Sequence, residues 1–228
     1  AHLSDFHYRP KHDDALLEKI IATLHQETPD VIALTGDFVN DDLSTLPKLL
    51  DFLSQLPSRH GVVAVLGNHD GQDKDLPQIR REFERAGITL LINEHRMLSI
   101  GDGQFAIAGT DHVWYGNADL AETFDEIPEG VPILALVHEP DFFDQVIDHR
   151  RVMLQLSGHS HAGQCRVPWL GYAPIKVKYG RKYLVGKFTR DGCHLFVTRG
   201  VGTVGLPVRF ACPPELAMLT LHAVEMIK

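Results

Sequence analysis

The chain has 228 residues, of which 44% are hydrophobic and 23% are charged, and its formal net charge at pH 7 is −8. This length favours a single domain spanning residues 1–228, because one hydrophobic core can serve a chain of up to roughly 250–300 residues. The acidic balance argues against nucleic acid as a partner, since sequence-independent binding needs a broad surface of lysine and arginine. No run of about 18 apolar residues is present, so the sequence predicts no membrane-spanning helix.

The three cysteines, Cys165, Cys193 and Cys212, are too few and odd in number to form a disulfide framework. We therefore expect free thiols in a reducing compartment, with a single disulfide as the alternative. Nothing at the start of the chain resembles a signal peptide. The chain opens at Ala1 without an initiator methionine, so an upstream leader outside this sequence stays open.

Short β-branched or aliphatic runs alternate with helical patterns through most of the chain, which favours parallel strands joined by helical crossovers in an α/β layered fold. The first helix has apolar residues at helical spacing and ends before Pro29; they are Leu16, Leu17, Ile20, Ile21 and Leu24. In chain order, the pattern predicts a helix over 13–26, a strand over 31–35, a helix over 44–55, a strand over 62–66, a helix over 76–85, extended segments over 88–92 and 105–108, a helix over 120–124, a strand over 133–137, a helix over 142–147 and a strand over 152–156.

Two turn signals predict β-hairpins in the remaining segments. Gly101-Asp102-Gly103 comes just before the extended segment at 105–108, and Asp191-Gly192 separates apolar residues in the part of the chain after Pro168, where the pattern becomes mostly β. A strand over 216–221 is expected to close the chain.

Side chains that can bind metals follow the predicted strands at five places. The five motifs are Asp5-Phe6-His7, Gly36-Asp37-Phe38-Val39-Asn40, Gly67-Asn68-His69-Asp70, His138 and Gly158-His159-Ser160-His161. Most of these motifs are weak alone, because Asn, Asp and Gly also favour ordinary turns. In open α/β sheets, however, the carboxyl ends of the strands form the ligand crevice, so five distant motifs are expected to converge there.

The residue types point to a metal centre. Residues two apart on extended backbone point to the same side, so Asp5 with His7, and His159 with His161, can each present two donors to one pocket. A mixture of carboxylate, amide and imidazole without thiolate suits Mn, Fe or Zn. Seven ligands exceed the needs of one ion, and a carboxylate can bridge two ions about 3.5–4 Å apart. Asp37 is the bridging candidate.

In order and spacing, these motifs resemble those of the calcineurin-like metallophosphoesterases, and the segment from Thr198 to Glu215 resembles a bacterial branch that includes membrane- or envelope-associated phosphodiesterases. The resemblance implies two mixed β-sheets sandwiched between helices. It also implies hydrolysis of phosphate esters, most often diesters, by in-line attack of a hydroxide that bridges two divalent metal ions, with Mn favoured and Fe or Zn as alternatives.

The same resemblance assigns the individual residues. His69 would stabilise the transition state or protonate the leaving group, without binding metal. The first metal would take Asp5, His7, Asp37 and His161, and the second would take Asp37, Asn68, His138 and His159.

Asn40 is a departure from the family pattern. Many members have aspartate there, and its carboxylate can pair with the catalytic histidine. Asparagine can form a hydrogen bond but supplies no negative charge to favour an imidazolium ion. The sequence therefore leaves the source of that charge open, with Asp70 as a residue that could orient or charge His69.

The segment after the last motif bears on the substrate. Trp169 and Tyr172 supply aromatic groups, and six lysines and arginines follow between residues 176 and 190. Aromatic and basic residues together suit an interfacial or lipid-phosphate substrate, although a solvated hairpin is the simpler interpretation. His112, which follows a predicted strand, is a further candidate for substrate binding.

Three functional hypotheses follow from these observations. The first is a hydrolase of phosphodiesters or phosphomonoesters, with diesters favoured, and the second is a hydrolase of a lipid-linked pyrophosphate such as UDP-2,3-diacylglucosamine. The third is a non-catalytic metal-binding scaffold on the same fold, for which loss of the catalytic histidine would be expected. The protein would be cytoplasmic or peripheral to a bacterial membrane, and the sequence predicts no oligomeric state.

Overall fold

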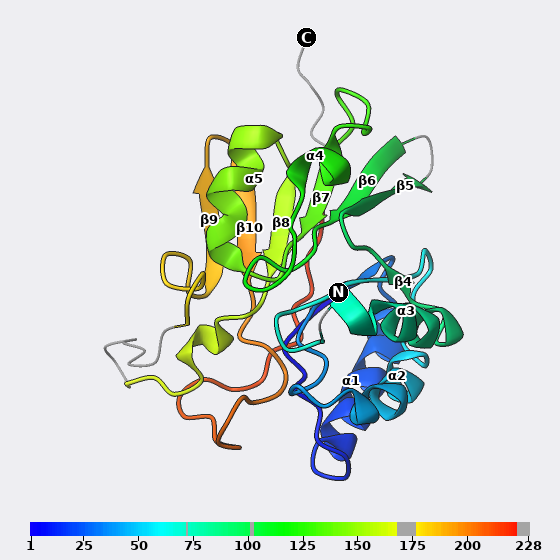
Figure 1. Ribbon diagram of the computed structural model, residues 1–228, viewed down its shortest axis with the longest axis vertical. Coiled ribbons are helices and arrows are strands. Elements are labelled where there is room, and N and C mark those ends of the chain that lie inside the picture. Colours follow the sequence, from blue (N-terminus) through cyan, green and yellow to red (C-terminus); the bar gives the residue numbers. More distant parts are fainter. Residues whose placement is uncertain (72, 101–102, 168–176, 223–228) are drawn as a thin grey trace.

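Two β-sheets lie against each other in the centre of the protein (Figure 1). The computed structural model describes residues 1–71, 73–100, 103–167 and 177–222. The four-stranded sheet is parallel throughout, in the order β1 (His2–Leu3), β2 (Ile32–Thr35), β3 (Val62–Val65) and β4 (Thr89–Leu90). The six-stranded sheet is mixed, in the order β5 (Glu94–Ile100), β6 (Gly103–Gly109), β7 (Ile133–Leu136), β8 (Leu154–Ser157), β10 (Cys193–Val197) and β9 (Gly186–Arg190).

Helices cover the outer faces of both sheets. Figure 1 shows α1 (Asp14–Glu27), α2 (Leu46–Leu53) and α3 (Leu76–Arg85) over the four-stranded sheet, and α4 (Leu120–Phe124) and α5 (Phe143–His149) over the six-stranded one. Short 3₁₀ helices cover Leu43–Thr45, Asp73–Asp75, Pro140–Phe142 and His161–Gly163. The predicted α/β architecture, with two sheets between helices, is confirmed. Within the described part of the chain, no helix is long and apolar enough to cross a bilayer.

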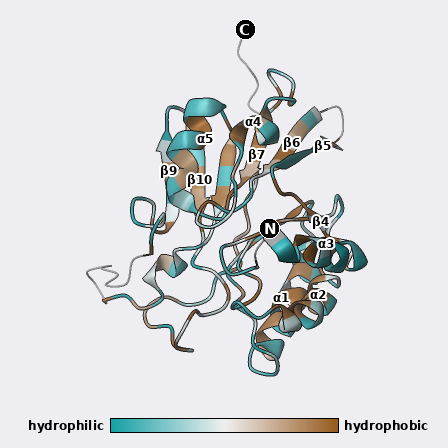
Figure 2. Cartoon of the chain, in the orientation of Figure 1, coloured by the Kyte–Doolittle hydropathy of each residue, from teal (hydrophilic) through white to brown (hydrophobic). Residues whose placement is uncertain are grey.

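The hydrophobic pattern accounts for this layering. Strands β2, β3, β7 and β8 are buried at every position, as expected for parallel strands covered on both faces. Helix α2 buries Leu46, Leu49, Leu50 and Leu53, the one-sided spacing of a helix that packs on a sheet. Figure 2 shows the apolar residues concentrated in the strands and on the helix faces that meet them. Apolar side chains thus form three layers, two between helices and sheets and one between the sheets.

Two strand predictions differ from the structure. The predicted closing strand over 216–221 is wrong, because among the described residues only Ala217 of this segment pairs, through a single antiparallel bridge to His2 on the short edge strand β1. Strand β5 was not predicted, since it is an edge strand with mostly exposed or half-buried side chains and lacks a long apolar run. It pairs with β6 over seven residues, and the pairing of Ile100 with Gly103 agrees with the predicted hairpin.

The carboxyl ends of strands from both sheets carry the predicted motifs. The five predicted motifs directly follow β1, β2 and β3 of the smaller sheet and β7 and β8 of the larger one. The apolar layer between the sheets includes Ala33, Val65, Leu136 and Leu156 from these strands. Packing between the sheets therefore sets the relative positions of the five motifs.

Gly109, at the end of β6, lies where the two sheets meet. A Cβ atom there would lie 2.5 Å from Cγ1 of Val65 and 2.7 Å from Cβ of Leu91. We expect Gly109→Ala to destabilise the protein by about 1–3 kcal/mol, the usual cost of overpacking, which corresponds to roughly 2–12 °C in Tm at this chain length. Thermal unfolding followed by circular dichroism measures the change. Gly103→Ala, where the nearest atom is the Ile100 carbonyl oxygen at 3.5 Å, is the control; equal Tm values for the two variants would contradict the packing argument.

Candidate metal centre

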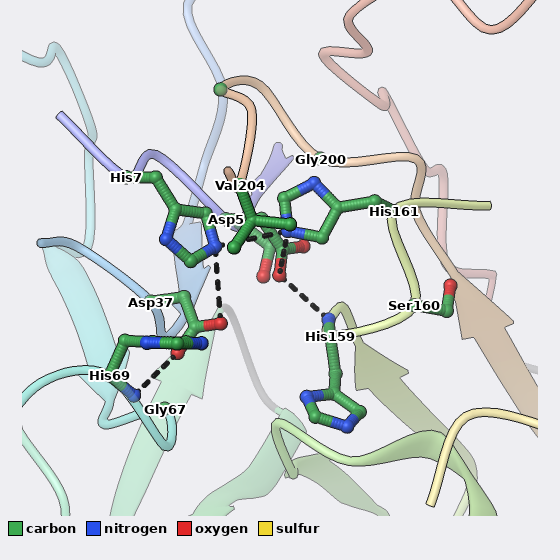
Figure 3. Close-up of polar contacts among 12 residues, drawn as sticks. Asp5, His7, Asp37, Gly67, His69, His159, Ser160, His161, Gly200 and Val204 are labelled. Carbon is green, nitrogen blue, oxygen red and sulfur yellow. Dashed lines mark hydrogen bonds and ion pairs between the residues drawn. The ribbon is translucent and has the colours of Figure 1, made fainter. Parts of the chain in front are cut away.

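Six of the predicted metal ligands converge in two groups that share one residue. Figure 3 shows all of them except His138. Within each group, one ligand atom from every residue lies within 4.8 Å of the others, and all six residues are buried. Asp37 belongs to both groups. The first group contains Asp5, His7, Asp37 and His161, and the second contains Asp37, His138 and His159.

The Asp37 carboxylate lies between the two groups. Its Oδ2 atom is 3.3 Å from Nε2 of His7 and 3.2 Å from Nε2 of His138. Its Oδ1 atom accepts a hydrogen bond from the backbone N–H of His69 at 3.0 Å. One oxygen of Asp37 is therefore fixed by the backbone, and the other faces histidines from both groups, which is the arrangement a bridging ligand requires.

Imidazole nitrogens face each other across the site. Nε2 of His7 and Nε2 of His161 are 3.0 Å apart, and Nε2 of His138 and Nδ1 of His159 are 3.2 Å apart. Each pair of ring nitrogens can therefore share one N–H proton or bind one cation between them.

Two buried oxygens add to the donor set. Within the described residues, Oδ2 of Asp5 and Oδ1 of Asn68 have no hydrogen-bond partner. Unpaired buried acceptors are costly, and a metal ion would satisfy both. The donors thus fit divalent cations at both groups. Asn68 lines the same cavity as His159 and stays the predicted further ligand of the second group.

Backbone carbonyls fix the orientation of the second group's histidines. Nδ1 of His138 donates to the carbonyl oxygen of Thr35 at 2.6 Å, which leaves Nε2 as the ligand atom. Nε2 of His159 donates to the carbonyl oxygen of Lys178 at 2.7 Å, which leaves Nδ1. Such contacts set the tautomer and the ring orientation of metal-binding histidines.

The backbone turns sharply at the ligands themselves. Five of them have a positive φ, the left-handed region that costs a residue other than glycine about 1–3 kcal/mol. The values are 56° for Asp5, 39° for His7, 54° for Asp37, 66° for His159 and 48° for His161. Gly158 also has no room for a side chain, because a Cβ atom there would overlap Oγ of Ser4 and Oδ2 of Asp5. Strain of this kind concentrates at functional sites, where the surrounding structure holds the ligands in place.

The buried charges shift each other's proton affinity. Burial would raise the pKa of Asp37, but His138 and His7 outweigh it and hold the pKa well below its usual range. Burial would likewise lower the pKa of His138, and Asp37 outweighs it and holds that pKa well above the usual range. Burial, reinforced by Asp37, raises the pKa of Asp5. Without metal, the carboxylates depend on protonated histidines for compensation.

His69 has a different carboxylate partner from the one expected. Its Nδ1 lies 2.9 Å from Oδ1 of Asp41, whereas the side chain of Asn40 is exposed and forms no hydrogen bond with the described residues. The charge that Asn40 does not supply is thus provided by the next residue. The sequence signal was the acidic residue directly after Asn40.

Asp70 holds the backbone of two motifs together instead of orienting His69. Its Oδ1 accepts hydrogen bonds from the N–H groups of Phe38 and Val39 at 2.6 and 3.1 Å, and its Oδ2 accepts one from Gly67 at 2.8 Å. The expectation that Asp70 is the partner of His69 is therefore corrected, because its two oxygens already bind three backbone amides.

The candidate substrate residues fall in two places. His112 is buried, and its Nδ1 accepts hydrogen bonds from the N–H groups of Tyr115 and Gly116 at 3.3 and 3.1 Å. It therefore stabilises a loop, and it also borders the larger of two cavities. Trp169 and Tyr172 lie outside the described residues.

Two adjoining cavities open at the site. The smaller, of about 250 Å³, is lined by His7, Asp37, Asp41, Asn68, His69, Trp114, Tyr115, His159, His161, Val177 and Val204. The larger, of about 670 Å³, shares Asp41, Asn68 and Tyr115 with it. Sequence reasoning missed Trp114 and Tyr115, although both come within three residues after His112.

Comparison with known proteins agrees with this geometry. A family model described as calcineurin-like phosphoesterase matches residues 1–163. The chain is 34% identical over 227 residues to the metallophosphoesterase YkuE of Bacillus subtilis (strain 168). That alignment covers 98% of this chain and 77% of YkuE. It is also 34% identical over 225 residues to the phosphodiesterase YaeI of Escherichia coli (strain K12), in an alignment that covers 96% of this chain and 80% of YaeI. The solved structure of TT1561 from Thermus thermophilus aligns with a TM-score of 0.58 and 14% identity over 87% of this chain and 88% of that one.

Proposed function

The chain belongs to the calcineurin-like phosphoesterase family, and from that premise we propose that it is a phosphodiesterase with two divalent metal ions, Mn first and Fe or Zn as alternatives. The observation that carries the proposal is the position of Asp37, whose Oδ2 faces histidines of both ligand groups at 3.2–3.3 Å. The name of the relative YaeI, a phosphodiesterase, supports diesters over monoesters.

The side chains around the smaller cavity would have three roles. Ions held by the two ligand groups would supply Lewis-acid activation of the phosphoryl group and of the attacking water. Asp37 links the two ligand groups, because its Oδ2 lies close to both His7 and His138. His69 borders the cavity, and a hydrogen bond from its Nδ1 to Asp41 leaves Nε2 as the nitrogen that can meet the substrate. In this position His69 can protonate the oxygen of the departing alcohol.

Hydrolysis of bis(4-nitrophenyl) phosphate tests the proposal. We expect chelator-stripped protein to be inactive and Mn²⁺ to restore turnover. Asp37→Asn and His69→Ala should each reduce kcat at least about 100-fold, because they remove a metal bridge and a general acid.

The exposed histidine variant His25→Ala serves as the control. A parent protein that binds two metal ions without any turnover of this diester would contradict the proposal. That outcome would favour the scaffold hypothesis or a narrow lipid substrate.

Asp41 is proposed to orient His69, because its Oδ1 lies 2.9 Å from Nδ1 of that histidine. Asp41→Asn keeps the shape of the side chain but removes the charge, so we expect kcat for the same diester to fall about tenfold, a fraction of the contribution of a general acid. Metal content, measured by elemental analysis, should stay unchanged. Asn40→Ala is the matched control with no expected effect. A larger loss for Asn40→Ala than for Asp41→Asn would contradict this role.

Exposed apolar side chains favour a second candidate, a lipid-linked pyrophosphate such as UDP-2,3-diacylglucosamine. Leu206 and Phe210 are 77% and 58% exposed, and Val208 is exposed as well. Their segment is tied to the chain just after His161, because Phe210 donates to the carbonyl oxygen of Gln164. Apolar groups therefore lie on the segment that also sends Val204 to the smaller cavity.

Vesicle binding distinguishes the lipid candidate. We expect the double variant Leu206→Ser, Phe210→Ser to lose most of its co-sedimentation with phosphatidylglycerol vesicles, because burial of these side chains would drive the association. Ile100→Ser, which replaces an exposed apolar residue at the end of β5, is the control. Equal co-sedimentation of the parent and the double variant would remove the support for a lipid substrate.

A further inference from the structure

The loop between β6 and α4 brings two aromatic side chains to the junction of the two cavities. Trp114 and Tyr115 line the smaller cavity, and Tyr115 also lines the larger one. Tyr115 is 72% exposed, more than any other Phe, Tyr or Trp in the described part of the chain. An exposed ring at this junction could contact the organic group of a phosphoester whose phosphate is bound at the metal centre.

Buried polar side chains hold this loop in place. Oδ1 of Asn93 accepts hydrogen bonds from the N–H groups of Asp111 and Asp119 at 2.9 and 3.0 Å. Oε2 and Oε1 of Glu139, which is fully buried beside His138, accept hydrogen bonds from the N–H groups of Val113 and Trp114, both at 3.0 Å.

Further contacts close the loop at its tip. Oδ2 of Asp111 accepts a hydrogen bond from the N–H of Asn117 at 2.8 Å, and Nδ1 of His112 accepts those of Tyr115 and Gly116. The backbone that presents Tyr115 is thus fixed before any ligand binds. Preorganisation of this kind lowers the entropic cost of binding.

The rings of Trp114 and Tyr115 lie one against the other. Trp114 and Tyr115 are stacked, with centroids 5.5 Å apart and planes inclined by 23°. Trp114 in turn packs edge-on against the ring of His159, with centroids 5.6 Å apart. One face of Tyr115 is therefore supported by Trp114, which is anchored to the metal centre. Such a supported ring is suited to stacking against a planar group.

The larger cavity has the size and the lining for an organic group. Its volume of about 670 Å³ falls within the range of about 300–1,000 Å³ that small-molecule sites occupy. Leu43, Leu66 and Leu76 give it apolar walls, and Lys74, Asp111 and His112 add polar groups. An acyl chain would cover the ammonium group of Lys74 without offering it a hydrogen bond, which is unfavourable. A sugar or a heteroaromatic ring offers Lys74 a hydrogen-bond acceptor.

We propose that the larger cavity binds the alcohol part of the phosphoester and that Tyr115 stacks on a planar ring within it, a nucleoside being the chemical class that fits best. The proposal rests on the proposed function, because it requires the phosphate to lie at the metal centre in the smaller cavity. Tyr115 acts as a determinant of substrate specificity and takes no part in breaking the P–O bond.

Binding of three product-like ligands to the Mn-loaded protein tests the proposal by calorimetry, without any need for turnover. Inorganic phosphate reports on the metal centre, ribose 5-phosphate adds the sugar, and adenosine 5′-monophosphate adds the planar base. We expect adenosine 5′-monophosphate to bind about tenfold more tightly than ribose 5-phosphate, as base–aromatic stacking usually provides. Tyr115→Ala should abolish that preference, and Tyr115→Phe should retain it.

Two results would overturn the inference while phosphate binding keeps the proposed function intact. One is equal affinity of the parent for the two sugar phosphates, and the other is an unchanged preference in Tyr115→Ala. Failure of all three ligands to bind the metal-loaded protein, together with no turnover of bis(4-nitrophenyl) phosphate, would overturn both the inference and the proposed function. The thermal unfolding of Tyr115→Ala, compared with that of Tyr115→Phe, separates loss of stacking from loss of fold.

Discussion

Asp5 and Asp37 are buried within the same cluster, and two carboxylates in such a place need nearby positive charge. Without metal, the raised pKa values of His7 and His138 show that protons supply part of it. Divalent ions would take the place of those protons, as metal binding to histidine generally requires. This need for cations accounts for the facing imidazoles and for the buried acceptors without partners. It also gives a reason for the left-handed backbone at the ligands, because a bound ion can offset local strain.

Both sheets are needed to build this cluster. Asp5, Asp37 and Asn68 follow strands of the smaller sheet, whereas His138 and His159 follow strands of the larger one. A change in the packing between the sheets would therefore separate carboxylates from imidazoles. The same dependence extends outward, since Glu139, next to His138, carries the backbone of the aromatic loop. Two neighbouring residues after β7 thus serve both sites: His138 belongs to the metal ligands, and Glu139 positions the aromatic loop.

Much of this arrangement was predictable because two local signals coincide: buried apolar runs define the strands, and metal-type residues follow those runs directly. The α/β layers, most helix positions and the convergence of six ligand residues follow from that coincidence. Contacts set by tertiary structure were not predictable. Asp41 reaches His69 and Asp70 does not, because the direction of each side chain depends on the turn that carries it. Strand β5 lacks an apolar run, and the segment at 216–221 has only a two-residue strand to pair with.

Anomalous diffraction from crystals of Mn-loaded protein would show whether the buried cluster binds two ions. We expect two anomalous peaks about 3.5–4 Å apart. The Asp37 carboxylate should lie between them, with His7 and His161 beside one peak and His138 and His159 beside the other. A single peak, or peaks that do not contact Asp37, would contradict the claim that this buried cluster is built around two metal ions.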